Sequence, residues 1–185
     1  MEFKDYIKEE TLLQALDILG WHTPTAIQEQ LFQLFSQYHA IMIQAQTGSG
    51  KTGAYALPIL DRIQWAENKV QCLILAPTRE LANQIREECE RLGKYKRIKS
   101  VALIGKQPMA FQMQDLHQKC HVAVGTPGRV LEHLHQGSLC VERLSYVVLD
   151  EADEMLNMGF RDTLEQILTC LPEQAQYCLC SATMS

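Results

Sequence analysis

The sequence has no long hydrophobic run, no excess of positive charge and no C-x-x-C cysteine pair. No stretch approaches the roughly 18 consecutive apolar residues of a membrane-spanning helix, so we expect no membrane segment. The first residues, MEFKDYIKEE, lack the basic start and apolar centre of a signal peptide, which predicts a cytoplasmic protein. With 17 Lys and Arg against 22 Asp and Glu, the net charge of -5 excludes a generally polybasic nucleic-acid binder but not a local phosphate-binding surface.

The cysteines and histidines lack the spacing of a zinc site or a disulfide framework. There are 7 cysteines, an odd number, and Cys72, Cys178 and Cys180 lie in apolar segments where a free cysteine behaves as a small hydrophobic residue. His133 and His135 are two residues apart, which would point them to different faces of a helix. We therefore expect a reducing compartment and no zinc.

The densest basic segment of the chain covers residues 86–99, where three glutamates interrupt the positive charge. Its basic residues are Arg86, Arg91, Lys94, Lys96, Arg97 and Lys99. A solvated helix face is the favoured interpretation of this pattern, and a phosphate-binding surface is the alternative.

Short apolar segments alternate with longer amphipathic segments along the chain. The short segments are rich in Val, Ile, Leu and Cys, as strands buried on both faces are. This alternation predicts a single α/β domain in which helices cover both faces of a mostly parallel central sheet. Expected strands span residues 40–44, 71–76, 100–104, 121–125, 146–150 and 176–181. Expected helices span residues 9–19, 24–37, 51–64, 80–92, 109–118, 128–136 and 160–171.

A phosphate-binding loop is the strongest local signal, because AQTGSGKT follows an expected strand and opens an expected helix. Glycines there let backbone N–H groups surround a phosphate, and the helix N-terminus favours negative charge. Lys51 would reach the β- and γ-phosphates of a nucleotide, and the Thr52 hydroxyl would bind Mg²⁺. The alternative, an ordinary glycine-rich turn, fits this context poorly. The expected ATP contacts in the loop are Ala45, Gln46, Thr47, Gly48, Ser49, Gly50, Lys51 and Thr52.

Two acidic residues follow the expected strand at residues 146–150. Asp150 would hold Mg²⁺, partly through water, and Glu151 would orient or deprotonate the attacking water. An acid in this position could equally cap the following helix. Next to a phosphate-binding loop we favour the functional interpretation, and assign Lys51, Asp150 and Glu151 as catalytic residues that act on ATP with Mg²⁺.

The acidic string Asp150-Glu151-Ala152-Asp153 resembles the signature of the DEAD-box RNA helicases. Five other strings resemble motifs of that family and occur in the family's order. They are PTAIQ at residues 24–28, the loop at 45–52, PTRELA at 77–82, TPGR at 126–129 and SAT at 181–183. The resemblance covers the whole chain and implies the N-terminal RecA-like domain of an ATP-dependent RNA helicase, with the adenine-recognition motif in a helical segment over residues 1–38.

The resemblance assigns adenine recognition to the segment before the sheet. Gln28 would read the adenine edge, Thr23 would offer its backbone to the base, and Trp21 would stack on it in place of the family's usual Phe or Tyr. Stacking on an aromatic side chain contributes roughly 1–3 kcal/mol per base. The alternative for Trp21 is a plain core anchor.

The resemblance also implies contacts to RNA phosphates and 2′-hydroxyls, which carry no sequence information. Surface ion pairs are the alternative for the two arginines. The expected RNA-contact residues are Pro77, Thr78, Arg79, Gly105, Thr126, Pro127, Gly128 and Arg129.

Three residues would couple ATP hydrolysis to strand separation: the family pairs Asp153 with Ser181 and Thr183. The chain departs from the family at Gly105-Lys106, where two glycines are usual, because Lys106 should not match a glycine's φ freedom. Lys106 would either add a cation to the RNA surface or lie in solvent. This pair and residues 155–160 resemble a bacterial branch that binds a hairpin of large-subunit ribosomal RNA.

The resemblance implies a second RecA-like domain, absent from this chain, that supplies the arginines acting on the transferred phosphoryl group. Such an arginine contributes about 10³–10⁵ in rate. We therefore expect the fragment alone to bind nucleotide with little or no hydrolysis, with a monomer as the default. Two rival functions are a P-loop ATPase acting on DNA or protein, and a nucleotide-dependent RNA clamp without useful turnover.

Overall fold

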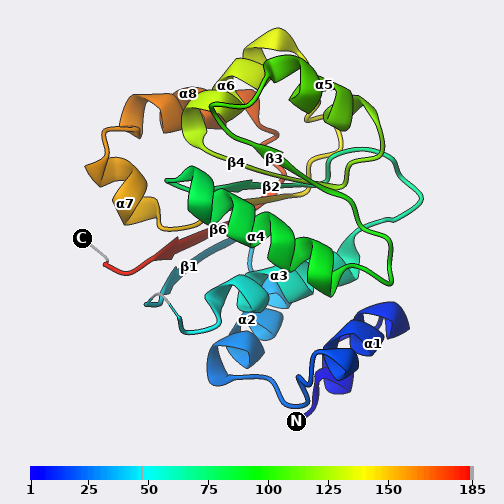
Figure 1. The fold of residues 1–185 in the computed structure, drawn as a ribbon. Coiled ribbons are helices and arrows are strands. Elements are labelled where there is room, and N and C mark those ends of the chain that lie inside the picture. Colours follow the sequence, from blue (N-terminus) through cyan, green and yellow to red (C-terminus); the bar gives the residue numbers. More distant parts are fainter. Residues whose placement is uncertain (47, 184–185) are drawn as a thin grey trace.

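The central element of the fold is a six-stranded sheet in which every strand pair is parallel. The computed structural model describes residues 1–46 and 48–183. The strand order is β1-β6-β5-β2-β4-β3 (Figure 1). The strands are β1 (Ala40–Gln44), β2 (Cys72–Leu75), β3 (Ser100–Leu103), β4 (Val122–Gly125), β5 (Tyr146–Leu149) and β6 (Gln176–Ser181).

Helices cover both faces of this sheet. In Figure 1 the helices α1 to α4 lie below the sheet and α5, α6 and α8 lie above it. None of the helices in the described ranges is long and apolar enough to cross a membrane. The helices are η1 (Phe3–Asp5), α1 (Glu10–Ile18), α2 (Ala26–Gln37), α3 (Lys51–Arg62), α4 (Arg79–Leu92), α5 (Met109–His117), α6 (Pro127–Gln136), α7 (Ala152–Asn157) and α8 (Arg161–Cys170).

Alternate residues of the inner strands enter different hydrophobic clusters. In β2, Cys72 and Ile74 join the cluster with the helices α1 to α4, while Leu73 and Leu75 join the cluster with α6 and α8. Successive side chains of a strand point to opposite faces of the sheet, so both faces of β2 are buried. This double burial explains why the expected strands are apolar throughout rather than alternating with polar residues.

The predicted α/β class and its parallel sheet with helices on both faces are confirmed. The helix starts differ from the prediction by one or two residues at α1, α2, α4, α6 and α8. The helix expected from residue 24 begins at Ala26, because Thr25 is its N-cap and exchanges hydrogen bonds with Gln28 in a capping box. The helix α6 begins at Pro127, a residue suited to the first helical position.

Two short helices, η1 and α7, were not predicted from the sequence. They have 3 and 6 residues, too few to show a helical hydrophobic period. The missed helix α7 directly follows Glu151, so it bears on the candidate site.

Five of the six strings singled out in the sequence lie at the carboxyl end of a strand, whereas PTAIQ at residues 24–28 precedes β1. Because every strand is parallel, these ends lie along one edge of the sheet. The loop at residues 45–52 follows β1, Asp150 follows β5, and Ser181 ends β6. The RNA strings follow β2, β3 and β4, which are neighbours in the other half of the sheet. The topology therefore separates the strings expected to bind nucleotide from those expected to bind RNA, and we call these two parts of the edge the nucleotide half and the RNA half.

Candidate functional site

The predicted phosphate-binding loop joins β1 to the N-terminus of α3. Gly48 and Gly50 have φ angles of 86° and 80°, in the left-handed region that glycine adopts without strain. Gly50 is the N-cap of α3, so the first N–H groups of that helix face the loop. Ala45 is buried and its N–H donates to the carbonyl of Ser181. Thr47, an expected ATP contact, lies outside the described residues. The loop thus presents backbone donors at a helix N-terminus, which is a suitable anion site.

A buried ion pair joins the loop to the end of β5. Lys51 Nζ lies 3.0 Å from Asp150 Oδ1, and Asp150 is fully buried. Tyr55, one turn further along α3, donates its hydroxyl to Asp150 Oδ2 at 2.8 Å. Burial, followed by the Asp150 charge, raises the pKa of Tyr55 well above its usual value. Tyr55 was not predicted as a site residue, because a tyrosine on the apolar face of a helix is indistinguishable from core.

The carboxylate of Asp150 also has the free acceptor capacity that Mg²⁺ requires. Despite the nearby ammonium, Oδ1 accepts no hydrogen bond of good geometry from the described residues. Thr52 is half-buried at the start of α3. Carboxylate and hydroxyl oxygens beside phosphates are the ligand set that Mg²⁺ takes in nucleotide sites. The residues present therefore fit the metal that the sequence implies.

Glu151 is held in a conformation that its residue type rarely adopts. Its φ and ψ of 52° and 51° lie in the left-handed region, and it is the N-cap of α7 without a side-chain cap. Such backbone strain is concentrated at functional sites. Burial raises the pKa of Glu151, the Lys51 charge lowers it, and the neighbouring acids raise it further. A raised pKa makes the carboxylate a better proton acceptor.

The segment expected to recognise adenine packs directly on the helix α3. Gln28 is buried, and its Oε1 accepts the N–H of Thr25 at 2.9 Å. A Cβ on Gly53 would lie 3.1 Å from the Trp21 ring and 3.3 Å from Gln28 Nε2. Trp21 is half-buried, so it packs on α3 and still exposes part of its ring, while Thr23 is exposed. The fold therefore brings Trp21 and Gln28 together beside the phosphate loop.

The two RNA strings cap the helices that follow β2 and β4. Thr78 Oγ1 accepts the N–H of Leu81 at 3.1 Å and caps α4, whereas Thr126 caps α6 without a side-chain hydrogen bond. Pro77 and Pro127 are buried, and Arg79 is half-buried.

Neither expected RNA-contact glycine is required by close packing. A Cβ added to Gly105 or Gly128 would meet nothing within 4 Å. Open space there suits the approach of a ligand backbone.

Arg129 is held by a buried polar network that was not predicted from the sequence. Its Nη1 donates to the carbonyl of Gln107 at 2.8 Å and to Gln112 Oε1 at 3.2 Å. Gln112 Nε2 in turn donates to the carbonyl of Ile104 at 2.7 Å. The network ties the loop after β3 to the start of α6. Gln112 looks like an ordinary polar residue in its sequence context, which is why no signal distinguished it.

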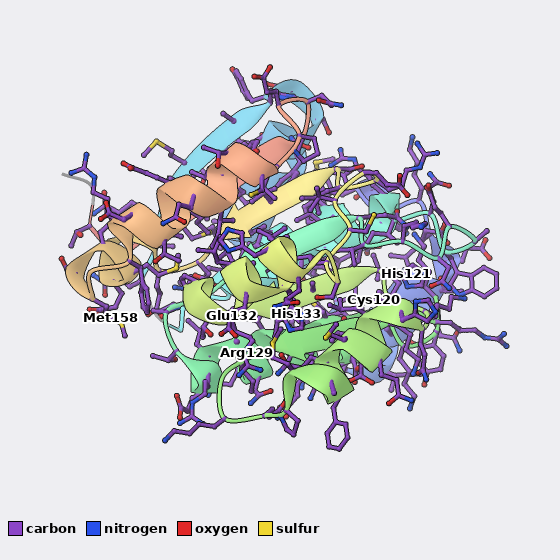
Figure 2. All side chains as sticks on the ribbon, turned by 90° about the horizontal axis from the view of Figure 1, so that it is seen from above. Cys120, His121, Arg129, Glu132, His133 and Met158 are labelled. Carbon is purple, nitrogen blue, oxygen red and sulfur yellow. The ribbon has the colours of Figure 1, made fainter. Side chains whose placement is uncertain are left out.

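His133 closes the network from the helix α6 and is completely buried (Figure 2). Its Nε2 lies 2.8 Å from Gln112 Oε1, and since that oxygen can only accept, Nε2 carries the proton. Its Nδ1 lies 2.7 Å from Ser138 Oγ. Burial, followed by the Arg129 charge, lowers the pKa of His133. Arg129 Nε also lies 3.4 Å from Glu132 Oε1, so the ion pair foreseen as the alternative for Arg129 is present as well.

The predicted coupling residues meet where β6 ends. Thr183 donates its backbone N–H at 3.2 Å and its hydroxyl at 3.0 Å to Asp153 Oδ2. Burial raises the pKa of Asp153, but hydrogen bonds from Thr183, the Glu154 backbone and Ser181 together outweigh it, and the net shift is downward. Ser181 Oγ donates to the carbonyl of Thr183, and the Ser181 hydroxyl also helps to lower the pKa of Asp153. The structure therefore brings Thr183 into direct contact with Asp153, with Ser181 hydrogen-bonded to Thr183.

The expectation that Lys106 cannot match a glycine's φ freedom is wrong. Lys106 has a φ of 63°, in the left-handed region, within the turn that follows β3. The turn demands this conformation, and a non-glycine residue adopts it at a cost of roughly 1–2 kcal/mol. Lys106 is exposed.

Comparisons with known proteins agree with this arrangement. The family model for the DEAD/DEAH box helicase matches residues 25–185. The chain is 46% identical to the ATP-dependent RNA helicase DbpA of Bacillus subtilis over 182 residues, which is 98% of this chain and 38% of that protein. It is 43% identical to the DEAD-box ATP-dependent RNA helicase CshA of Bacillus cereus, with 98% and 35% covered.

A solved structure has the same fold. The crystal structure of a DEAD box protein from the hyperthermophile Methanococcus jannaschii superposes with a TM-score of 0.93 at 38% identity. It covers 100% of this chain and 51% of that one. The chain thus spans well under half the length of the two curated relatives. The chain belongs to the DEAD/DEAH box helicase family.

Proposed function

We propose that this member of the family is the ATP-binding half of an ATP-dependent RNA helicase. It would couple ATP binding and hydrolysis to local RNA duplex unwinding or to remodelling of RNA–protein complexes. The observation that carries the proposal is the sheet edge itself. One half of that edge holds the buried Lys51–Asp150 pair beside a phosphate loop, and the other half holds the two RNA strings.

The nucleotide half supports a division of roles among its residues. The Lys51 ammonium would bind the β- and γ-phosphates, and Trp21 and Gln28 would contact adenine. Thr52 and Asp150 would hold Mg²⁺, which supplies charge neutralisation for phosphoryl transfer when bound. Glu151 would orient the attacking water and accept its proton, a role that its raised pKa favours.

The RNA half would bind the sugar–phosphate backbone without reading sequence. Thr78, Arg79 and Arg129 lie at neighbouring strand ends, and Gly128 is the second residue of a helix of 10 residues whose first N–H groups suit a phosphate. Contacts by a few backbone amides and two arginines reconcile RNA binding with the net charge of -5. A hairpin of large-subunit ribosomal RNA as the target stays a prediction.

We further propose that a second RecA-like domain of the same protein completes the ATP site. The lengths of the relatives support this, since the chain covers only 38% of DbpA. The chain alone would then bind nucleotide and hydrolyse it barely or not at all, as a monomer. A cytoplasmic location is supported by 7 free cysteines, 5 of them buried, with burial raising the pKa of Cys89 and Cys120 to about 12.

The test is ATP hydrolysis by the full-length protein with and without RNA. We expect RNA, and not DNA of the same sequence, to stimulate hydrolysis. Glu151→Gln should abolish the stimulation while ATP and RNA still bind, whereas Glu154→Gln, on the exposed face of α7, should not. Equal stimulation of hydrolysis by DNA would indicate the rival function, a P-loop ATPase that acts on DNA or protein. ATP-dependent RNA binding with no turnover in the wild type would indicate the clamp.

A further inference from the structure

The strand β3 forms an open edge of the sheet. The carbonyl oxygens of Lys99 and Leu103 accept hydrogen bonds from the β4 side, at 2.9–3.1 Å and 3.1 Å. Backbone groups of alternate residues in a strand point to opposite sides. The N–H and C=O groups of Ser100 and Ala102 therefore face away from the sheet. In Figure 1, β3 lies between α5 above it and α4 below it, and it is the outermost strand.

A groove of about 450 Å³ runs along this edge between α4 and α5. We call it the β3-edge groove, and its main lining residues are Arg86, Lys99, Ser100, Ala102, Gln107 and Lys119. Ser100 is only 6% exposed, and its hydroxyl has no hydrogen-bond partner among the described residues. A buried hydroxyl without a partner is uncommon, and here it lines an open groove.

The amino-terminal end of the groove is basic. An adjoining hollow shares Lys99 and Lys119 with the groove and adds Lys94, Arg97 and Trp65. Within the described ranges, none of these four basic side chains has a carboxylate within 4.0 Å. Two acids, Glu90 and Asp115, line the two hollows, so the local balance is positive in a chain whose net charge is -5.

An aromatic side chain accompanies this positive charge. Trp65 is 40% exposed, and Lys119 Nζ lies 3.5 Å from the centre of its ring. Lysines beside an exposed aromatic ring are the combination with which proteins hold single-stranded nucleic acid, through phosphates and stacked bases.

The groove is continuous with the RNA half of the sheet edge. Gln107 lines its other end, and the carbonyl of Gln107 accepts the Arg129 hydrogen bond at 2.8 Å. Figure 2 labels Arg129 at one end of the sheet and His121, two residues beyond Lys119, toward the other. An RNA strand that runs from Arg129 along the groove would therefore pass Gln107 first and the two lysines, Lys99 and Lys119, last.

We propose that the β3-edge groove is a second binding site for single-stranded RNA, extending the RNA half from Arg129 to Lys119. This rests on the proposed function, because it continues the same RNA strand. Lys99 and Lys119 contact phosphates, Trp65 stacks on a base, and the Ser100 hydroxyl donates to the backbone. The charge favours RNA over a peptide strand added to the β3 edge, which would need no cluster of cations.

The test is the affinity of the full-length protein, with a non-hydrolysable ATP analogue, for single-stranded RNAs of about 6 and about 14 nucleotides, within the range of known site sizes. Lys99→Glu with Lys119→Glu should weaken binding of the longer RNA by about tenfold or more and leave the shorter RNA unaffected. Arg143→Glu with Arg161→Glu, at exposed sites outside the groove, matches the change in net charge and should alter neither affinity.

Two further measurements separate a direct contact from a general charge effect. Lys99→Ala with Lys119→Ala should reduce the slope of log K against log salt by about 1.4 for the longer RNA, since each lost single-strand phosphate contact contributes about 0.7. Ser100→Ala should produce a smaller loss in the same direction. Unchanged binding of the longer RNA by the glutamate variant would overturn the proposal that the groove binds RNA. The proposed RNA-binding function of the protein would still stand. No binding of either RNA by the wild type would overturn the proposed function and the groove with it.

Discussion

The two halves of the carboxyl edge are built on different principles. The nucleotide half, at the ends of β1, β6 and β5, contains a fully buried carboxylate and an ammonium, with one carboxylate oxygen lacking a hydrogen-bond donor. The RNA half, at the ends of β2, β4 and β3, is held by Gln112 and His133, which hydrogen-bond each other and fix Arg129. One half is centred on a buried ion pair, and the other on hydrogen bonds between uncharged groups that position Arg129.

The nucleotide half therefore depends mainly on the attraction between buried charges, and the RNA half depends mainly on side chains held in fixed positions. Buried charges stabilise a fold only while both partners remain, since an unpaired buried ion is very costly. A neutral network contributes less per bond but fixes positions. We therefore expect substitutions in the nucleotide half to be costlier for stability than those in the RNA half.

The largest effect is expected at the buried ion pair. Lys51→Met leaves Asp150 charged, buried and bonded only to Tyr55, so the free energy of unfolding should fall by about 3–5 kcal/mol without nucleotide. Lys69→Met breaks an exposed pair with Glu142 and should cost less than about 1 kcal/mol. Urea unfolding of both variants measures the contrast. Equal losses would mean that Lys51 and Asp150 do not interact as the structure indicates.

Removing the centre of the neutral network should have the next largest effect. Gln112→Leu leaves the Ile104 carbonyl and His133 Nε2 without their partner, at a cost of about 2–3 kcal/mol. It should also weaken RNA binding, because Arg129 loses an acceptor. Gln114→Leu, exposed on the same helix, should stay within about 0.5 kcal/mol. If the two variants unfold alike in urea, the network does not hold the RNA half together.

Two threonines in equivalent places of the RNA half should differ. Thr78 caps α4 through its side chain and Thr126 makes no such bond. Thr78→Ala should cost about 1 kcal/mol, and Thr126→Ala clearly less. Thermal unfolding of the pair is the measurement, and a larger loss for Thr126→Ala would contradict the assigned caps.

The smallest expected effect is a gain in stability. Lys106→Gly should raise the free energy of unfolding by about 0.5 kcal/mol, because a left-handed residue is relieved of strain while the unfolded chain gains freedom. A loss in chemical denaturation would show that Lys106 makes contacts that outweigh its strain.

The predictable parts of this molecule are those that depend on local sequence. The doubly buried strands follow from runs such as residues 72–75, and the phosphate loop from its glycines and Lys51. The fully parallel topology then places five of the six strings at one edge, the exception being PTAIQ at residues 24–28, which precedes the sheet. The missed parts depend on tertiary contact. The pairing of Gln112 with His133 joins two helices, and Tyr55 reaches Asp150 across the sheet edge.

Local conformation produced the remaining errors. The helix α7 has only 6 residues and follows a left-handed Glu151, so its sequence shows no helical hydrophobic period. Lys106 adopts the left-handed conformation that usually favours glycine, because its turn requires it. A lysine in the sequence gives no sign of such a conformation.

The central claim, that the nucleotide half binds adenine nucleotide, is tested most directly by calorimetry with ADP and GDP in the presence of Mg²⁺. The packing of Trp21 and Gln28 on α3 predicts that ADP binds about tenfold or more tightly than GDP, in line with the loss when a buried polar group lacks its partner. Gln28→Ala should reduce this preference. Equal affinity for ADP and GDP in the wild type would contradict the account.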